Sequence, residues 1–130
     1  MPRVFLDANV LFSAAYREGA GLLALWQASG VELLTSGYAA EEARRNLDTA
    51  ERRAGLERLL ASVEIVPEAP GAILPAGVRL PEKDEPILRA AIACGATHLL
   101  TGDIRDFGRL LGRRAGDLLV QTPGDFLRSR

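Results

Sequence analysis

The sequence predicts an α/β protein, a three-layer α/β/α fold in which a parallel sheet of about five strands lies between helices. Short apolar runs alternate along the chain with longer segments whose apolar residues recur about every 3.6 positions. This alternation is typical of βαβ units, whose strands are parallel. The length of 130 residues favours a single domain, residues 1–130.

The elements follow one another in a regular order, with glycine or proline between most of them. The predicted strands are Arg3–Leu6, Val31–Thr35, Val63–Val66, His98–Thr101 and Leu118–Gln121. The predicted helices are Asn9–Arg17, Ala20–Ser29, Tyr38–Leu47, Thr49–Ala61 and Glu85–Cys94, followed by a short helix from Asp106 and a closing helix from Pro123. Four prolines between the third strand and Asp84 predict a long loop there. Trp26 is expected on a buried helix face, and a dimer interface is the alternative.

The composition excludes several classes of protein. A hydrophobic fraction of 48% and a charged fraction of 25% are those of an ordinary folded protein, not of a disordered one. Cys94 is the only cysteine, so neither an internal disulfide nor a cysteine-based zinc site is available. No apolar run approaches the roughly 20 residues that span a bilayer, and Asp7 interrupts the start too early for a signal peptide. We therefore expect a soluble, cytoplasmic protein without a membrane partner.

The formal net charge of −1 gives no overall attraction to nucleic acid. Almost all the positive charge is arginine, which suits bidentate recognition of phosphate; Lys83 is the only lysine. Arg44 and Arg45 are the candidate nucleic-acid contacts. The alternative is that they form an ordinary solvated helix face.

Acidic residues gather at one predicted edge of the sheet. Asp7 directly follows the first strand, and Asp103 follows the strand that ends at Thr101. Asp84 opens the last long helix, Glu85–Cys94, and Glu42 lies in the first turns of the helix after the second strand. Ligands of open parallel sheets bind beyond the carboxyl ends of the strands, where these four residues are expected to meet.

Helical phase separates Glu42 from its neighbour Glu41. The apolar stripe of their helix consists of Ala39, Ala40, Ala43, Leu47 and Ala50. At 100° per residue, Glu42 lies beside the edge of this stripe and Glu41 lies nearly opposite its centre. Glu42 is therefore predicted to face the crevice between helix and sheet, and Glu41 to face water.

Each acid also has a structural interpretation. Asp84 suits the N-cap of its helix, which is the favoured interpretation for that residue taken alone. Asp103 and Asp106 have the spacing of a pair at a helix start, close to a capping box. Glu42 alone would be a helix-surface acid. Asp7 is the hardest to explain structurally, because a carboxylate after a buried strand is costly without partners.

Together the four carboxylates point to a metal ion. Without a counter-ion they would repel one another and raise their pKa values. Mg²⁺ and Mn²⁺ are hard ions that prefer oxygen ligands, and they serve in phosphoryl-transfer chemistry by activating water and stabilising charge on phosphate. His98 is not expected to take part, because it lies at the opposite end of its strand.

In these features the chain resembles the PIN-domain family, over essentially its whole length. The matching segments are Phe5-Leu6-Asp7-Ala8-Asn9-Val10-Leu11, Thr35-Ser36, Glu41-Glu42-Ala43-Arg44-Arg45-Asn46-Leu47, Asp84-Glu85-Pro86-Ile87-Leu88-Arg89-Ala90-Ala91, Leu99-Leu100-Thr101-Gly102-Asp103 and Thr122-Pro123-Gly124-Asp125-Phe126-Leu127. The resemblance implies Mg²⁺- or Mn²⁺-dependent cleavage of RNA. It assigns the metal-site and catalytic roles to Asp7, Glu42, Asp84 and Asp103, with Asp106 as an auxiliary acid and with Asn9 and Thr101 as supports for the carboxylates.

The resemblance also implies partners, because many small members are toxins restrained by an antitoxin protein and many form homodimers. Two positions depart from the family pattern. Ala8 stands where relatives often carry a hydroxyl residue, and Asp106 stands where close relatives often carry histidine before Phe107. Neither departure removes an expected ligand.

Three other classes of protein share the size or the acidic character of this site. A two-component receiver domain would need paired acids after the first strand and a lysine near the end, which this chain lacks. A haloacid dehalogenase phosphatase would need a second aspartate where Asn9 stands. A non-catalytic PIN-like module that binds RNA or protein is the main alternative, although loss of acids is its usual sign and none of the four is missing.

Overall fold

A computed structural model describes residues 1–17 and 21–130 of the chain. Strand β1, Arg3–Leu6, is a central strand with β2 (Glu32–Ser36) on one side and β4 (His98–Leu100) on the other. Both pairings are parallel, with Phe5 opposite Leu34 of β2 and Leu99 of β4. These three strands are largely buried, as near-continuous runs of apolar residues predict for a sheet covered on both faces.

Within the described residues the sheet has six strands, in the order β3-β2-β1-β4-β6-β5. Strands β3 (Glu64–Val66) and β6 (Leu118–Gln121) extend the parallel arrangement, so the five predicted strands are confirmed. The sixth, β5 (Arg114–Ala115), pairs antiparallel with β6 and was not predicted. With only two residues, β5 is too short to show the alternation of polar and apolar residues by which a strand is predicted. The sheet is therefore mixed rather than purely parallel.

Helices flank the sheet as the sequence predicts, with ends that differ by one or two residues at most elements. They are α1 (Ala8–Tyr16), α3 (Gly37–Asn46), α4 (Ala50–Leu60), α5 (Glu85–Ala93), α6 (Ile104–Phe107) and α7 (Pro123–Arg128). Side-chain oxygens of Ser36, Thr49 and Thr122 accept backbone N–H groups at the starts of α3, α4 and α7. Helix α6 begins before the predicted Asp106, because Asp103 caps it.

The predicted helix Ala20–Ser29 is the largest error in the helix prediction. Its first residue lies outside the described ranges. The remainder forms a 3₁₀ turn, η1 (Gly21–Leu23), and one short α-helix, α2 (Ala24–Gln27). Trp26 is half-buried against the core, and its indole N–H donates to the Leu59 carbonyl at 3.0 Å. That contact supports the expected packing role of Trp26.

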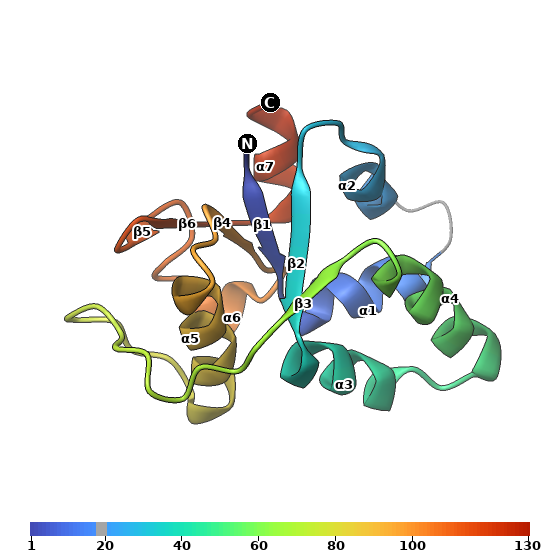
Figure 1. Cartoon of the computed structure of the whole chain (residues 1–130), viewed down its shortest axis with the longest axis horizontal. Coiled ribbons are helices and arrows are strands. Elements are labelled where there is room, and N and C mark those ends of the chain that lie inside the picture. Colours follow the sequence, from blue (N-terminus) through green and yellow to red (C-terminus); the bar gives the residue numbers. More distant parts are fainter. Residues whose placement is uncertain (18–20) are drawn as a thin grey trace.

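Figure 1 shows the arrangement in space, with α5 and α6 on one side of strands β1–β3 and α1, α3 and α4 on the other. The proline-rich segment after β3 forms the long loop expected there. The loop ends at the 3₁₀ helix η2 (Glu82–Asp84), which directly precedes α5. Among the described residues, no helix is long and apolar enough to cross a membrane.

The carboxyl ends of β1, β2 and β4 lie at the same edge of the sheet, because the three strands are parallel and in register. Helices α1 and α3 begin directly after β1 and β2 at this edge. The fold therefore delivers the residues after Leu6, Ser36 and Leu100 to one region of the surface.

Candidate metal centre

A pocket of about 370 Å³ opens at this edge of the sheet. All four acids that the sequence singled out line it, and they come from four different segments of the chain. The lining residues are Asp7, Ala8, Asn9, Phe12, Glu42, Asn46, Lys83, Asp84 and Asp103.

Asp7 is the most firmly held of these acids. Its side chain is buried and forms the N-cap of α1, where Oδ1 accepts the Ala8 N–H at 2.7 Å. Oδ2 accepts the Thr101 hydroxyl at 2.7 Å and the Asn9 side-chain amide at 3.1 Å. Burial raises the pKa of Asp7 to about 6, against these hydrogen bonds, which favour the charged form. Repulsion from Glu42 and Asp103 contributes to this raised pKa.

Asn9 and Thr101 connect the ends of β1 and β4. The Asn9 side-chain carbonyl accepts the Gly102 N–H at 2.8 Å, and the Asn9 amide lies 3.3 Å from the Thr101 hydroxyl oxygen. Thr101 is fully buried, and its hydroxyl oxygen also accepts the Asp103 N–H at 3.0 Å. These contacts fix Asp7 relative to Asp103, in keeping with the supporting role that the family resemblance implies.

Asp84, Asp103 and Asp106 form a second group within the site. One carboxylate oxygen from each lies within 4.8 Å of the others. Asp103 caps α6 through Oδ1, which accepts the Asp106 N–H at 2.9 Å, so the capping interpretation is correct for Asp103. It is wrong for Asp84, whose side chain makes no capping hydrogen bond. Capping of α5 therefore does not explain the burial of Asp84.

Asp84 carries an electrostatic cost. The residue is 7% exposed, and its Oδ2 atom has no hydrogen-bond partner among the residues that the structure describes. Burial, together with the hydrogen bond and the charge of the adjacent Asp106 carboxyl group, raises the pKa of Asp84 to about 7. A buried carboxylate oxygen without a donor is a position at which a bound cation would be stabilising.

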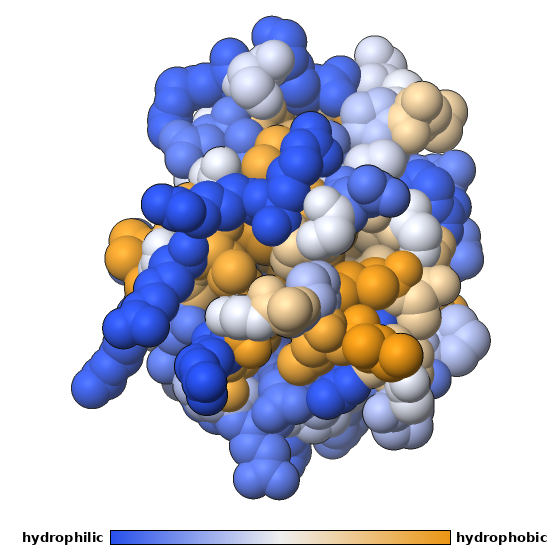
Figure 2. All heavy atoms as spheres, turned by 90° about the vertical axis from the view of Figure 1, so that its left-hand side faces the viewer, coloured by the Kyte–Doolittle hydropathy of each residue, from blue (hydrophilic) through white to orange (hydrophobic). Residues whose placement is uncertain are grey.

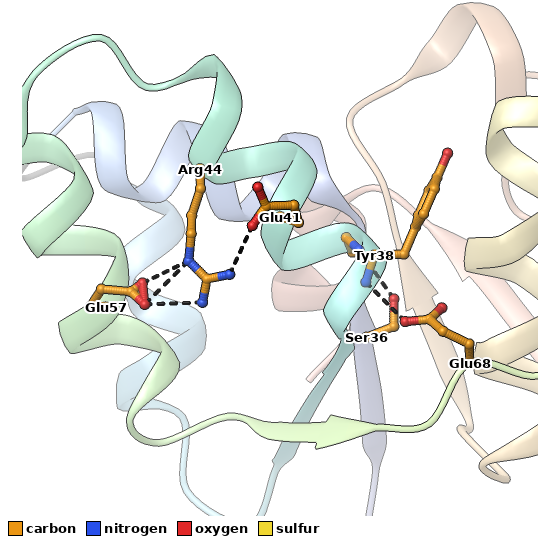
Figure 3. A network of polar contacts seen from close by, with 7 residues as sticks. Ser36, Tyr38, Glu41, Arg44, Glu57 and Glu68 are labelled. Atoms are coloured by element: carbon orange, nitrogen blue, oxygen red, sulfur yellow. Dashed lines mark hydrogen bonds and ion pairs between the residues drawn. The ribbon is translucent and has the colours of Figure 1, made fainter.

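Glu42 and Glu41 occupy the positions that helical phase predicts. Glu42 lines the pocket, while the Glu41 side chain is 58% exposed and pairs with Arg44 at 3.4 Å. Figure 3 shows the Arg44 guanidinium reaching from α3 toward Glu57 of α4, with Glu41 beside it. The guanidinium of Arg44 is thus already engaged by two carboxylates.

The start of α3 is held in place at the same edge. Ser36 accepts the Ala39 N–H at 3.2 Å, and Glu68 of the long loop accepts the Tyr38 N–H at 2.9 Å (Figure 3). The Tyr38 hydroxyl donates to the Lys83 carbonyl at 2.6 Å, which links α3 to the turn that carries Asp84. Glu42 and Asp84 are thereby held on neighbouring elements.

Three lining residues were not predicted from the sequence as parts of the site: Phe12, Asn46 and Lys83. Phe12 lies on a helical face that sequence periodicity alone does not orient toward a pocket. Asn46 could have been found, because it lies one helical turn after Glu42 on the same side of α3. Lys83 could have been predicted from the sequence, because it is the only lysine of the chain and directly precedes Asp84, a candidate metal ligand. His98 lies at the amino end of β4 and packs edge-on against Phe126, with ring centroids 5.0 Å apart.

The donor set fits a hard divalent cation. Asp7, Glu42, Asp84 and Asp103 offer only oxygen, and the pocket lining contains neither histidine nor cysteine. Asp106 lies close enough to Asp84 and Asp103 to contribute as well. The acidic pocket with an unpartnered buried carboxylate oxygen therefore suits Mg²⁺ or Mn²⁺ better than Zn²⁺, which prefers nitrogen and sulfur ligands.

Comparisons with known proteins agree with this geometry. A family model described as PIN domain matches residues 3–105. The crystal structure of VapBC2 from Rickettsia felis bound to a DNA fragment from its promoter is similar, with a TM-score of 0.68 and 17% identity over 92% of this chain and 98% of that chain. The structure of VapBC-1 from nontypeable Haemophilus influenzae gives a TM-score of 0.60 and 16% identity over 94% of this chain and 98% of that chain. No curated protein matches significantly.

At these identities the two structures establish similarity of fold. The family model covers most of the chain, including Asp7, Glu42, Asp84 and Asp103. Together with the acidic pocket, it supports a nuclease-type role.

Proposed function

The chain belongs to the PIN-domain family, and we propose that it is a ribonuclease that hydrolyses RNA phosphodiester bonds with Mg²⁺ or Mn²⁺. Asp7, Glu42, Asp84 and Asp103 would hold the ion, and Asp106 would assist them. The observation that carries the proposal is the convergence of these acids in one pocket, where Asp7 and Asp84 are buried and have raised pKa values. Residues placed at such cost are typical of functional sites.

The bound ion would lower the pKa of an attacking water and stabilise negative charge on the scissile phosphate. The chain's own contribution is to fix the positions of the carboxylates before the ion and the substrate bind. Asp7 is fixed by three donors, so it keeps its position as substrate arrives. Thr101 acts on both sides of the site, because its hydroxyl group donates to Asp7 and accepts the Asp103 N–H.

RNA contact is proposed for Arg44 and Arg45, near Glu42 on α3. Arg45 is exposed and forms no ion pair with any other part of the described chain. Arg44 is paired with Glu57 at 3.0 Å, so it would have to exchange this partner for a phosphate. Arg45 is therefore the stronger candidate of the two.

An antitoxin partner and a homodimer are also part of the proposal. The antitoxin is inferred from the likeness to the two VapBC structures. For the homodimer, Figure 2 shows apolar patches among hydrophilic side chains on the face that forms the left-hand side of Figure 1. Exposed large apolar residues within the described ranges include Ile73 of the long loop and Ile104 of α6. A cytoplasmic location is likewise part of the proposal.

The test uses purified protein with a panel of single-stranded and structured RNAs in Mg²⁺, Mn²⁺ or EDTA. Asp7→Asn and Asp103→Asn are the site variants, and Asp117→Asn in the exposed β5–β6 turn is the matched control. We expect cleavage that needs metal, disappears in both site variants and persists in the control. Cleavage that persists in the site variants would reveal a contaminating nuclease. A folded protein that binds metal and cleaves no RNA would favour the non-catalytic binding module.

A further inference from the structure

Lys83 places a positive charge within the acidic site. Its ammonium group lies 3.2 Å from Oδ2 of Asp106, and Lys83 also lines the pocket. Asp106 in turn shares its carboxylate cluster with Asp84 and Asp103. The hydrogen bond to Asp106, with the charge of Asp84 next, raises the pKa of Lys83 above its ordinary value. The only lysine of the chain therefore lies where the proposed divalent cation would be attracted.

The backbone and the ammonium group of Lys83 are held very differently. The Lys83 carbonyl accepts the Tyr38 hydroxyl at 2.6 Å, and the next residue, Asp84, donates its N–H to the Pro81 carbonyl at 2.9 Å. The side chain, by contrast, is 63% exposed. Exposed ion pairs are weak because water competes for both charges. The ammonium group can therefore leave Asp106 without disturbing the turn that positions Asp84.

One ammonium group does not neutralise this cluster. It pairs with Asp106, while Asp84 Oδ2 stays without a partner among the described residues. A divalent ion carries twice the charge and can contact several carboxylates at once. The Lys83 ammonium group therefore reduces the repulsion among the carboxylates, yet it is bound weakly enough for a divalent ion to displace it.

We propose that Lys83 is a built-in counter-ion that competes with the divalent metal ion for Asp106 and its neighbouring carboxylates. Metal binding then requires the ammonium group to leave Asp106, and Lys83 lowers metal affinity while it supports the metal-free protein. This inference rests on the proposed function, because it assumes that the acidic pocket binds a divalent ion. It assigns Lys83 an effect on occupancy of the site, not a contact with the reacting atoms.

The test is calorimetric titration of the metal-free protein with Mn²⁺ and with Mg²⁺ at low salt. The variants are Lys83→Met, which keeps the length of the side chain, Lys83→Gln as a second neutral variant, and Lys83→Arg, which keeps the charge. Arg105→Gln is the matched control, since Arg105 is an exposed cation next to Asp106 in sequence and forms no ion pair inside the described ranges. Thermal unfolding in EDTA is measured for every protein.

We expect both neutral variants to bind metal about three- to tenfold more tightly than the wild type, because a competing charge a few ångströms away is removed. The difference should shrink toward 1 M NaCl, where the Debye length is about 3 Å. In EDTA the neutral variants should unfold at lower temperature, while Lys83→Arg and Arg105→Gln resemble the wild type in affinity and stability.

Equal or weaker metal binding by both neutral variants would overturn the counter-ion role and leave the metal site intact. Absence of binding by the wild type and every variant would instead overturn the metal site itself, and the competition with it. Tighter binding by the neutral variants that does not depend on salt would also contradict the proposal, because it would place the cause in packing and not in charge.

Discussion

Replacing Asp84 with asparagine should stabilise the metal-free protein, although it removes a proposed metal ligand. Asp84 is 7% exposed, and its Oδ2 atom lacks a donor in the described part of the chain. An asparagine of nearly the same shape removes the buried charge. Its amide group can donate to the nearby carboxylate of Asp106, which lies in the same cluster.

The magnitude follows from the pKa. Burial and the neighbouring Asp106 raise the pKa of Asp84 from 3.8 to about 7. One pKa unit corresponds to about 1.36 kcal/mol, so this shift sets an upper limit of about 4 kcal/mol at pH 8. Water penetration and relaxation reduce such penalties, and we expect about 2 kcal/mol. For a chain of 130 residues this raises the unfolding temperature by about 8 °C.

The direction of the pKa shift of Asp84 also determines how the stability of the protein depends on pH. Since the pKa of Asp84 is higher in the folded protein, the folded state binds the proton more tightly than the unfolded state. The wild type in EDTA should therefore be most stable below about pH 4 with respect to this group, and should lose that stability as the pH rises toward about 7. The Asp84→Asn variant should lack this loss of stability with rising pH. It should keep the loss that Asp7 causes, because the pKa of Asp7 is raised to about 6.

The assay is thermal unfolding of the wild type, Asp84→Asn and Asp117→Asn in EDTA from pH 4 to pH 8, repeated with excess Mg²⁺. Mg²⁺ should stabilise the wild type and the control far more than Asp84→Asn, because ligand binding stabilises only the state that binds it. An Asp84→Asn protein that is no more stable than the wild type at pH 8 in EDTA would refute the reasoning.

Three further predictions concern the supports of the site and the surface around it. Thr101→Val removes the hydroxyl donor to Asp7 and should weaken Mn²⁺ binding about tenfold or more in a calorimetric titration, with the fold intact by circular dichroism; unchanged affinity would show that Asp7 needs no such support. Arg45→Ala should weaken binding of a non-cleavable RNA and flatten its salt dependence more than Arg44→Ala does, because Arg44 is already paired; the reverse order in a binding titration would contradict this. Ser36→Ala removes the N-cap of α3 and should cost about 1 kcal/mol in chemical denaturation, whereas an unchanged midpoint would show that the cap contributes nothing.

The sequence predicted the carboxyl edge of the sheet well for physical reasons. A buried strand forces the next residue to emerge at a defined edge, so Asp7 and Asp103 could be placed from Val4–Leu6 and Leu99–Leu100 alone. Helical phase likewise separated Glu42 from Glu41, because 100° per residue leaves little freedom once the apolar face is known.

Tertiary contacts decided what the sequence could not. The capping preference of aspartate predicted the wrong role for Asp84, since its side chain faces the pocket instead of the first turn of α5. Strand β5 depends on pairing with β6 and not on its own two residues. The ion pair between Lys83 and Asp106 joins a turn to a different helix across 23 positions, which no local pattern encodes.

The most direct test of the central claim is anomalous diffraction from crystals soaked in Mn²⁺. The proposed site predicts an anomalous peak in the pocket within coordination distance of oxygens from Asp7, Asp84 and Asp103, and its loss in the Asp7→Asn variant. A pocket without such a peak at saturating Mn²⁺, or a peak only at other acidic residues, would contradict the claim that these carboxylates form a metal centre.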